Sequence, residues 1–264
     1  MEGARHGIST VLRDIVAQFG LPSVLSFRLI MESTGCVVSG SYALLALHPG
    51  AFKPEDLDLY VPSDGFDTLV GYLQQNGYTL DASPTDYQYL SPSILNVRRL
   101  VHRDTHTAID VVSIQGHDPL KAVVEFHSTL LMNAITSSGG ICLYASLTLR
   151  RLGIINYGLS TTAPGGIIVF DKYRLHGFTL EESMHRLDNY TIPSGHRCRV
   201  DPSCPSTVRT VYDSGSLFIA LDGFDEHLPS HRPTLVWKLA NDSCCPGETD
   251  GFTIGPNCVV CECY

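Results

Sequence analysis

The chain has 264 residues, 44% of them hydrophobic and 17% charged, a composition that excludes a disordered chain and a length that allows one large domain or a core with an appended region. Its 18 Lys and Arg residues stand against 27 Asp and Glu, and the net charge of −9 does not favour binding to extended nucleic acid. We find no apolar run long enough to cross a membrane and no signal-peptide core in Met1 to Thr10, so we expect no membrane partner and an intracellular, by default cytoplasmic, location.

Hydrophobic periodicity predicts a regular succession of helices and strands over the first 126 residues. In chain order we expect a helix over 8–20, a strand at 36–39, a helix over 42–47, a strand at 57–61 with one solvated face, a helix over 64–75 capped by Asp64, paired strands over 94–102 and 107–114, and a helix over 119–126 capped by Asp118. This order predicts an α+β fold in which a mixed sheet is flanked by helices.

The composition changes after about residue 190, where Pro, Ser, Gly and Cys become more frequent. Only two strand signals occur there, at 216–222 and 234–239. We therefore expect three regions, which are a core over 1–135, a helical extension over 136–190, and a loop-rich Cys/Pro-rich region over 191–264 that packs on the core. The loop at 82–93 is either a lid or a surface connection.

The segment that carries most chemistry runs from residue 37 to 61, VVSGSYALLALHPGAFKPEDLDLYV. Gly40 and Ser41 follow a strand and open a helix. A glycine at that point lets the backbone approach a phosphate without a Cβ in the way, and the amides at a helix start can hold the anion.

Three acidic residues could form a metal site beside this turn. Asp56 and Asp58 are two residues apart on a predicted strand, so both carboxylates should project from the same face. Hard oxygen ligands on a rigid strand suit Mg²⁺. Asp110, within TAIDVV on a later strand, is placed to add a third carboxylate.

This pattern resembles the signature of the nucleotidyltransferase superfamily, the DNA polymerase β-like fold, over roughly residues 30–115. The resemblance rests on the Gly-Ser turn, the short helix, the Asp-x-Asp between apolar residues and the later strand acid, with a slightly long spacing from Ser41 to Asp56. The segments FHSTLLMNAI, CLYASLTLRR, CPSTVR and VWKL also resemble uncharacterised fungal proteins, mainly from basidiomycetes, that carry the same core. That second resemblance gives no activity.

The superfamily resemblance implies a metal-dependent enzyme that moves an NMP from an NTP, with ATP as the default donor, to an acceptor hydroxyl. Mg²⁺ or Mn²⁺ would be held by Asp56, Asp58 and Asp110, with a second metal on Asp56 and Asp58 that binds the triphosphate. The acceptor could be a small molecule, a protein side chain or an RNA end.

The same resemblance implies a nucleotide-binding set next to the carboxylates. Gly40 and Ser41 would contact the phosphates. Lys53, in the loop before the acids, could add positive charge.

Other interpretations stay open at this point. The chain could be a catalytically inactive module that binds a nucleotide or a protein through the same fold. Asp56 and Asp58 could be the solvated face of an edge strand, and Asp110 could face water or pair with Arg103.

Two further groups of residues invite a functional hypothesis. His127 and Ser128 could line the active site, although a helix cap or a core histidine is the favoured interpretation. Seven of the nine cysteines lie after residue 197, and a third hypothesis places the function in this tail. Zinc is not favoured, because Cys258, Cys261 and Cys263 lack a clean second knuckle, and His196, Cys198 and Cys204 are a weaker set.

Overall fold

The structure is a computed structural model that describes residues 2–81, 91–156, 166–187, 199–221, 234–239 and 261–263. The chain divides into two compact units. Unit 1 comprises Met1–Val123, Asn133–Ile141 and Phe218–Glu226, and unit 2 comprises Val124–Met132, Cys142–Leu217 and His227–Tyr264.

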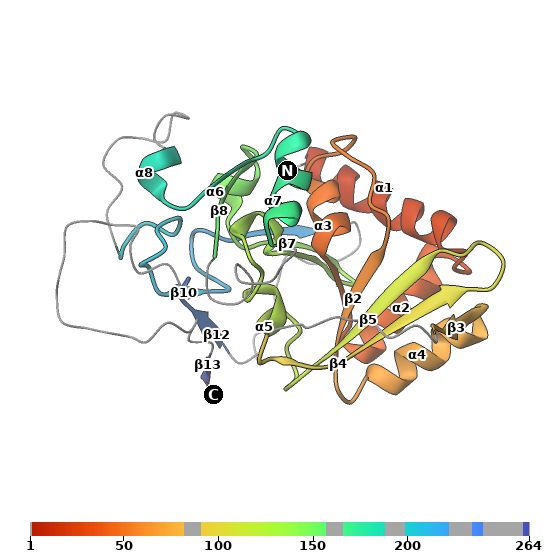
Figure 1. Cartoon of the computed structure of the whole chain (residues 1–264). Coiled ribbons are helices and arrows are strands. Elements are labelled where there is room, and N and C mark those ends of the chain that lie inside the picture. The colour runs from red at the N-terminus through yellow and green to blue at the C-terminus, as the bar shows by residue number, and fades with distance from the viewer. Residues whose placement is uncertain are drawn as a thin grey trace. The chain divides into compact units, whose positions relative to one another are not determined.

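Unit 1 is built around an eight-stranded sheet (Figure 1). In spatial order its strands are β11 (Leu217–Ala220), β7 (Gly139–Cys142), β6 (Asn133–Ile135), β1 (Val37–Ser39), β2 (Leu57–Pro62), β5 (Ala108–Ile114), β4 (Ile94–His102) and β3 (Tyr78–Leu80). The neighbours β2 and β5 are parallel, whereas β1–β2, β1–β6, β4–β5 and β3–β4 are antiparallel. The predicted α+β architecture with a mixed sheet is therefore confirmed.

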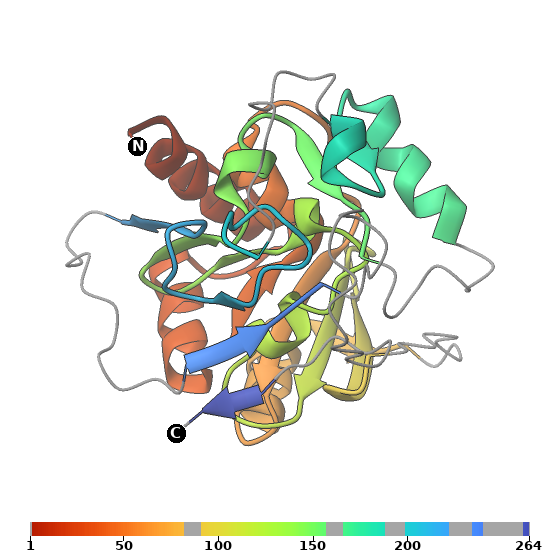
Figure 2. The same ribbon diagram turned by 90° about the vertical axis from the view of Figure 1, so that its left-hand side faces the viewer.

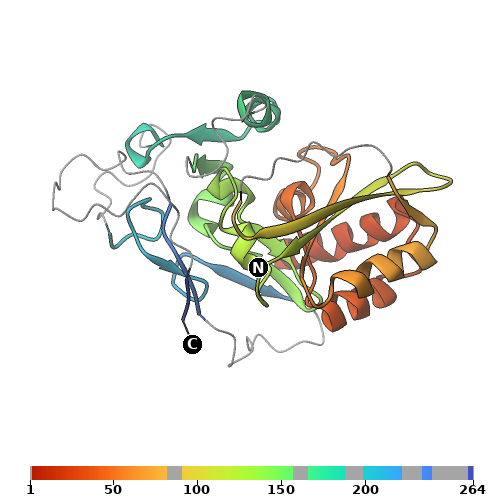
Figure 3. The same cartoon turned by 60° about the horizontal axis from the view of Figure 1, so that its bottom comes forward.

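The helices of unit 1 lie beside this sheet, as Figure 3 shows for the red and orange ribbons. They are α1 (Glu2–Gln18), α2 (Val24–Thr34), α3 (Gly40–Leu47), α4 (Phe66–Gln75) and α5 (Leu120–Val123). Helix α1 packs against α3 and α2, and α2 packs against α4. The α1–α3 approach requires Gly7, because a Cβ there would lie 2.1 Å from the carbonyl oxygen of Ala46.

The central strand β2 differs from its prediction in one respect. Five of its six residues are buried and only Asp58 is partly exposed, so the expected solvated face is wrong. The physical reason is that β2 lies inside the sheet between β1 and the parallel strand β5, where side chains on both faces are covered.

Two helix starts test the predicted caps. Asp118 caps α5 as expected, since its Oδ1 accepts a hydrogen bond from the backbone N of Leu120 at 3.0 Å. The cap at Asp64 is wrong, because α4 begins at Phe66 with Gly65 as its N-cap.

Unit 2 contains short helices and strands. Its elements are the 3₁₀ turn η1 (Thr129–Leu131), α6 (Ala145–Thr148), β8 (Leu152–Ile154), α7 (Gly166–Leu175), β9 (Thr179–Glu181), α8 (Met184–Leu187), β10 (Arg209–Thr210), β12 (Thr234–Trp237) and β13 (Cys261–Cys263). Strands β8 and β9 are parallel, and β12 pairs antiparallel with both β10 and β13, the latter pair being visible in blue in Figure 2. The segment 136–190, expected to be helical, thus contains strands as well as helices where it is described.

Across the described ranges, no helix is both long enough and apolar enough to cross a membrane.

Candidate functional site

One row of polar side chains crosses the sheet of unit 1 on four adjacent strands. Ser39 on β1 is paired with Asp58 on β2, and Asp58 is paired in turn with Asp110 on β5. Arg99 on β4 is the partner of Asp110. Side chains directly opposite one another on neighbouring strands point to the same face, so two carboxylates and one guanidinium lie in a row on one face of the sheet.

The carboxylate of Asp58 lies against the start of α3. Gly40 has φ +64°, a left-handed conformation that favours glycine, and a Cβ at this residue would lie 2.5 Å from Oδ2 of Asp58. Any larger residue at position 40 would collide with the carboxylate. The approach also sets Asp58 beside the positive end of a helix whose first residues are Gly40 and the buried Ser41.

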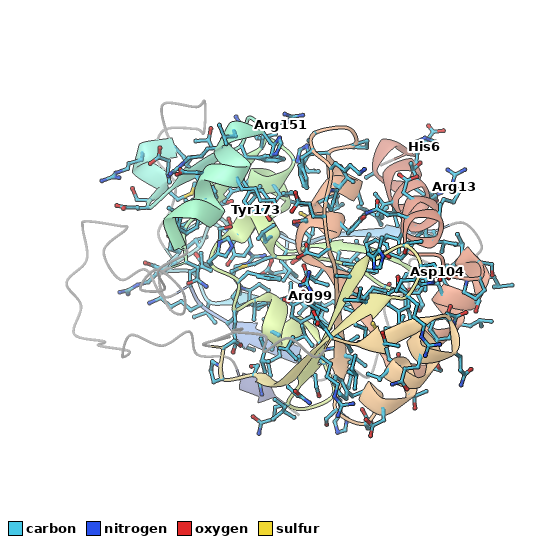
Figure 4. The ribbon with its side chains drawn as sticks, turned by 45° about the vertical axis from the view of Figure 1, so that its right-hand side comes forward. His6, Arg13, Arg99, Asp104, Arg151 and Tyr173 are labelled. Carbon is cyan, nitrogen blue, oxygen red and sulfur yellow. The ribbon has the colours of Figure 1, made fainter. Side chains whose placement is uncertain are left out.

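Asp110 is the most buried acid of the row. Its side chain is 1% exposed, and Oδ2 accepts a hydrogen bond from Nη1 of Arg99 at 3.0 Å. The hypotheses that Asp110 faces water or pairs with Arg103 are therefore both wrong. Figure 4 labels Arg99 on the faint yellow ribbon of β4, while His6 and Arg13 project from α1.

Asp56 and Lys53 lie before β2 rather than on it. Asp56 occupies a bend just before Leu57 and is half-buried, whereas Lys53 is exposed in the preceding loop. Within the described ranges, no group of three or more His, Cys, Asp or Glu side chains is close enough to hold a metal ion. The shared metal role of Asp56, Asp58 and Asp110 stays a prediction.

Tyr42 is a buried tyrosine on α3 whose hydroxyl is influenced by two nearby acids. Its ring packs edge-on against Phe19 with centroids 5.8 Å apart, and its side chain is buried. Burial raises the pKa of the Tyr42 hydroxyl, and the negative charges of Asp14 and Asp56 raise that pKa further. Among the described residues the hydroxyl has no hydrogen-bond partner.

Arg99 is the site residue that the sequence analysis missed. The signal was present in the hairpin, because Val101 lies opposite Ala108, and moving two residues away from the turn along each strand sets Arg99 opposite Asp110.

His127 and Ser128 belong to unit 2 and have a core environment. The His127 ring meets the Phe170 ring edge-on at 5.1 Å, and Ser128 is fully buried. Burial lowers the pKa of His127 to about 4, against a smaller opposing backbone hydrogen bond, so this imidazole is neutral near pH 7. The interpretation of His127 as a helix cap or a core histidine stays a prediction, since its Nδ1 has no hydrogen-bond partner among the described residues.

The cysteines give no metal centre among the residues that the structure describes. Cys36, Cys142 and Cys204 are buried and form no disulfide. His196, Cys198 and Cys258 lie outside the described residues, as do positions 82–90 of the loop considered as a lid. For Cys261 and Cys263 the structure describes only the backbone, in β13.

The arrangement in unit 1 is suited to a cation and a phosphate. Asp58 and Asp110 provide hard oxygen ligands in register. The N-terminus of α3, which begins at Gly40, lies beside Asp58. Arg99 adds a planar cation that is suited to carboxylate or phosphate oxygens.

Comparisons with known proteins add a likeness of fold only. No family model matches the chain, and no curated protein matches it. Among solved structures it is similar to the Thermotoga maritima CCA-adding enzyme complexed with tRNA_CCA, with a TM-score of 0.45, 16% sequence identity and coverage of 62% of this chain and 40% of that one. It is also similar to the apo form I of a CCA-adding enzyme, with a TM-score of 0.38, 13% identity and coverage of 62% and 41%. Neither likeness assigns this chain to a family or to an activity.

Proposed function

We propose that this chain is a metal-dependent nucleotidyltransferase that moves an NMP from an NTP, with ATP as the default donor, to an acceptor hydroxyl. The observation that carries the proposal is the contact of Asp58 with Gly40 at the start of α3, in register with Asp110. It combines an anion-binding helix end with two carboxylates on adjacent strands. The sequence resemblance over residues 30–115 points to the same chemistry.

One group of residues would bind the phosphates of the nucleotide, and a second group would bind the metal. Gly40 lets the Asp58 carboxylate approach the start of α3, where the amide of Ser41 and its hydroxyl would bind the phosphate oxygens. Lys53 would add positive charge to that side of the site.

Asp58 and Asp110 fit a divalent cation, because both are oxygen donors and lie side by side on rigid strands. Asp56, two residues before Asp58, would complete the set. When bound, Mg²⁺ or Mn²⁺ would supply charge neutralisation at the phosphates and a lower pKa for the acceptor hydroxyl.

The reaction forms a bond from the acceptor oxygen to the α-phosphorus and breaks the bond from that phosphorus to the bridging oxygen, releasing pyrophosphate. The proton of the hydroxyl passes to water as the new bond forms, and the buried pair of strands β2 and β5 holds the carboxylates in fixed register during that step. Because the chain has a net charge of −9, a small molecule or a short end is favoured over a long nucleic acid as acceptor.

A second function is favoured by one observation. Arg99 already pairs with Asp110, and an arginine on the third carboxylate is also what a module that binds nucleotide without turnover would have. Such a module would bind ATP through the start of α3 and transfer nothing.

The test is transfer of α-labelled ATP, GTP, CTP and UTP, with Mg²⁺ or Mn²⁺, to small molecules, RNA and protein. Asp58→Asn should reduce transfer to background, because it removes the charge beside Gly40 while keeping the shape. Asp64→Asn is the matched control, since this acid in unit 1 has a side chain that is 71% exposed and lies outside the row.

Label that reaches an acceptor with wild type and Asp64→Asn, but not with Asp58→Asn, supports the enzyme and identifies the acceptor class. Equal transfer by wild type and Asp58→Asn refutes the site. No transfer together with measurable ATP binding by calorimetry supports the binding module instead.

A further inference from the structure

The Arg99–Asp110 pair joins a buried acid to a cation that reaches solvent. The two residues are opposite each other on the antiparallel strands β4 and β5, with Nη1 and Oδ2 3.0 Å apart. Asp110 is 1% exposed, whereas the Arg99 side chain is 28% exposed. A carboxylate at that depth requires a positive partner, because an uncompensated buried charge is strongly destabilising.

The Arg99 guanidinium lies where it would repel a cation bound to Asp110. Asp58 lies in register with Asp110 on the other side of β5 from β4, so a cation shared by the two carboxylates would bind next to the oxygen atoms of Asp110. Arg99 already neutralises that carboxylate and would repel a divalent ion at close range.

Arg99 can be displaced toward solvent, because its side chain is already 28% exposed.

We propose that Arg99 is a latch on the metal site, which holds Asp110 in the metal-free protein and is displaced when a divalent cation binds. This proposal rests on the proposed function in one respect, which is that Asp110 is a metal ligand. It assigns Arg99 a regulatory role, so that the cation replaces the guanidinium as the partner of the buried acid and the site loads at a higher metal concentration than it would without Arg99.

A different role for Arg99 would change metal affinity in the opposite direction. If Arg99 were an outer-shell partner that orients Asp110 toward the metal, its removal would weaken metal binding. If Arg99 is a latch, its removal strengthens metal binding, because a competing positive charge is lost.

The experiment is a titration of the full chain with Mn²⁺, followed by the electron paramagnetic resonance signal of the free ion, which needs no nucleotide and no turnover. We expect Arg99→Met to bind Mn²⁺ about tenfold more tightly than wild type. Arg98→Met is the matched control, since this neighbour lies on the same strand but pairs with Asp67 and stacks on Phe66. It makes the same change in net charge and should leave the affinity near that of wild type.

The role of Asp110 is tested by repeating the comparison in an Asp110→Asn background, where the latch has no carboxylate to hold. The effect of Arg99→Met on Mn²⁺ affinity should then disappear. Circular dichroism confirms that each variant is folded, and Arg99→Gln, which keeps a polar side chain, replaces Arg99→Met if the latter does not fold.

Unchanged or weaker Mn²⁺ binding by Arg99→Met and Arg99→Gln overturns the latch, and so does equal tightening by Arg98→Met or an absence of Mn²⁺ binding in every variant. The proposed function is tested apart from this, by label transfer. Transfer by wild type without tightening in Arg99→Met refutes the latch alone, and tightening without transfer refutes the enzyme alone.

Discussion

The two units each contain an arginine–aspartate pair beneath the surface, and the two pairs differ in how completely they are enclosed. In unit 2, Arg209 is 0% exposed and its Nε and Nη2 donate to the two carboxylate oxygens of Asp213 at 2.6 and 2.7 Å. Its nitrogens also donate to the carbonyl oxygens of Leu143 and Pro202. In unit 1, Arg99 reaches Asp110 through Nη1 at 3.0 Å and stays partly open to solvent.

Aromatic rings complete the enclosure in unit 2. The Arg209 guanidinium lies 4.4 Å from the ring centroid of Tyr144 and 5.3 Å from that of Trp237, and the Trp237 Nε1 donates to the Tyr144 hydroxyl at 3.0 Å. Burial by itself would raise the pKa of Asp213, but hydrogen bonds from Arg209 and nearby backbone amides outweigh burial and lower it. Two hydrogen bonds to the carboxylate and two adjacent aromatic rings are typical of a pair with a structural role, as in Arg209–Asp213. The Arg99–Asp110 pair is partly exposed and lies beside a second carboxylate, so its arginine can be replaced by another cation.

The largest expected effect comes from breaking the structural pair. Arg209→Met should lower the free energy of unfolding by about 3–5 kcal/mol, because Asp213 and two carbonyl groups lose their donor inside unit 2. Arg99→Met should lower it by a smaller amount, about 2–3 kcal/mol, because the buried Asp110 loses its cation but water can enter where Arg99 was partly exposed. Urea unfolding, followed by the fluorescence of the single tryptophan and by circular dichroism, measures both.

Arg186→Met is the control for loss of a charge, since this arginine makes an exposed pair with Glu182 and should change stability by less than about 0.5 kcal/mol. Equal losses for Arg209→Met and Arg99→Met would remove the distinction between the two pairs.

Much of the fold in unit 1 follows from local pattern. The strands at 94–102 and 107–114 were predicted nearly to the residue, because alternation and a polar turn together determine a hairpin. Helix α2 was missed, although Ser23 caps it and Gly35 ends it in a left-handed conformation. Its exposed face carries Leu25 and Leu29, which obscure the amphipathic pattern that marks a helix.

The site was predictable only as far as chain order allowed. Gly40, Asp58 and Asp110 were named from spacing, and the structure brings Asp58 against Gly40 and in register with Asp110. That β2 pairs parallel with β5 depends on contacts between distant segments, which one-dimensional spacing does not contain. For the same reason the sequence did not reveal that Asp110 is buried. It therefore did not reveal that the Asp110 carboxylate requires Arg99 as a positive partner.

A second expected effect concerns the enclosed imidazole of unit 2. The pKa of His127 is lowered by burial from its ordinary value near 6.5 to about 4, so between these values the unfolded chain binds a proton that the folded chain excludes. Stability from this residue is therefore fully present above pH 6.5 and is lost as the pH falls toward 4, by on the order of 2 kcal/mol. Urea unfolding between pH 7.5 and 4.5 measures this loss.

His127→Phe keeps an edge contact with Phe170 and removes the titration, so its stability should fall less steeply with pH than that of wild type. The two proteins are compared first at pH 7.5, where both side chains are neutral, to set the baseline. Parallel curves for the two proteins would show that His127 takes up its proton in the folded state at its ordinary pKa.

The smallest expected effect comes from the enclosed hydroxyl of unit 1. Among the described residues the Tyr42 hydroxyl has no hydrogen-bond partner, so Tyr42→Phe should change the free energy of unfolding by less than about 1 kcal/mol, and in the stabilising direction. Tyr78→Phe is the matched control in the same unit, because the Tyr78 hydroxyl donates to the carbonyl oxygen of Phe19 at 2.7 Å and its loss should be destabilising by about 1–2 kcal/mol. Urea unfolding of both variants decides the matter. If Tyr42→Phe were as destabilising as Tyr78→Phe, the Tyr42 hydroxyl would be bonded in solution, and the neighbouring carboxylates of Asp14 and Asp56, whose charges raise its pKa, would be the first candidates for its acceptor.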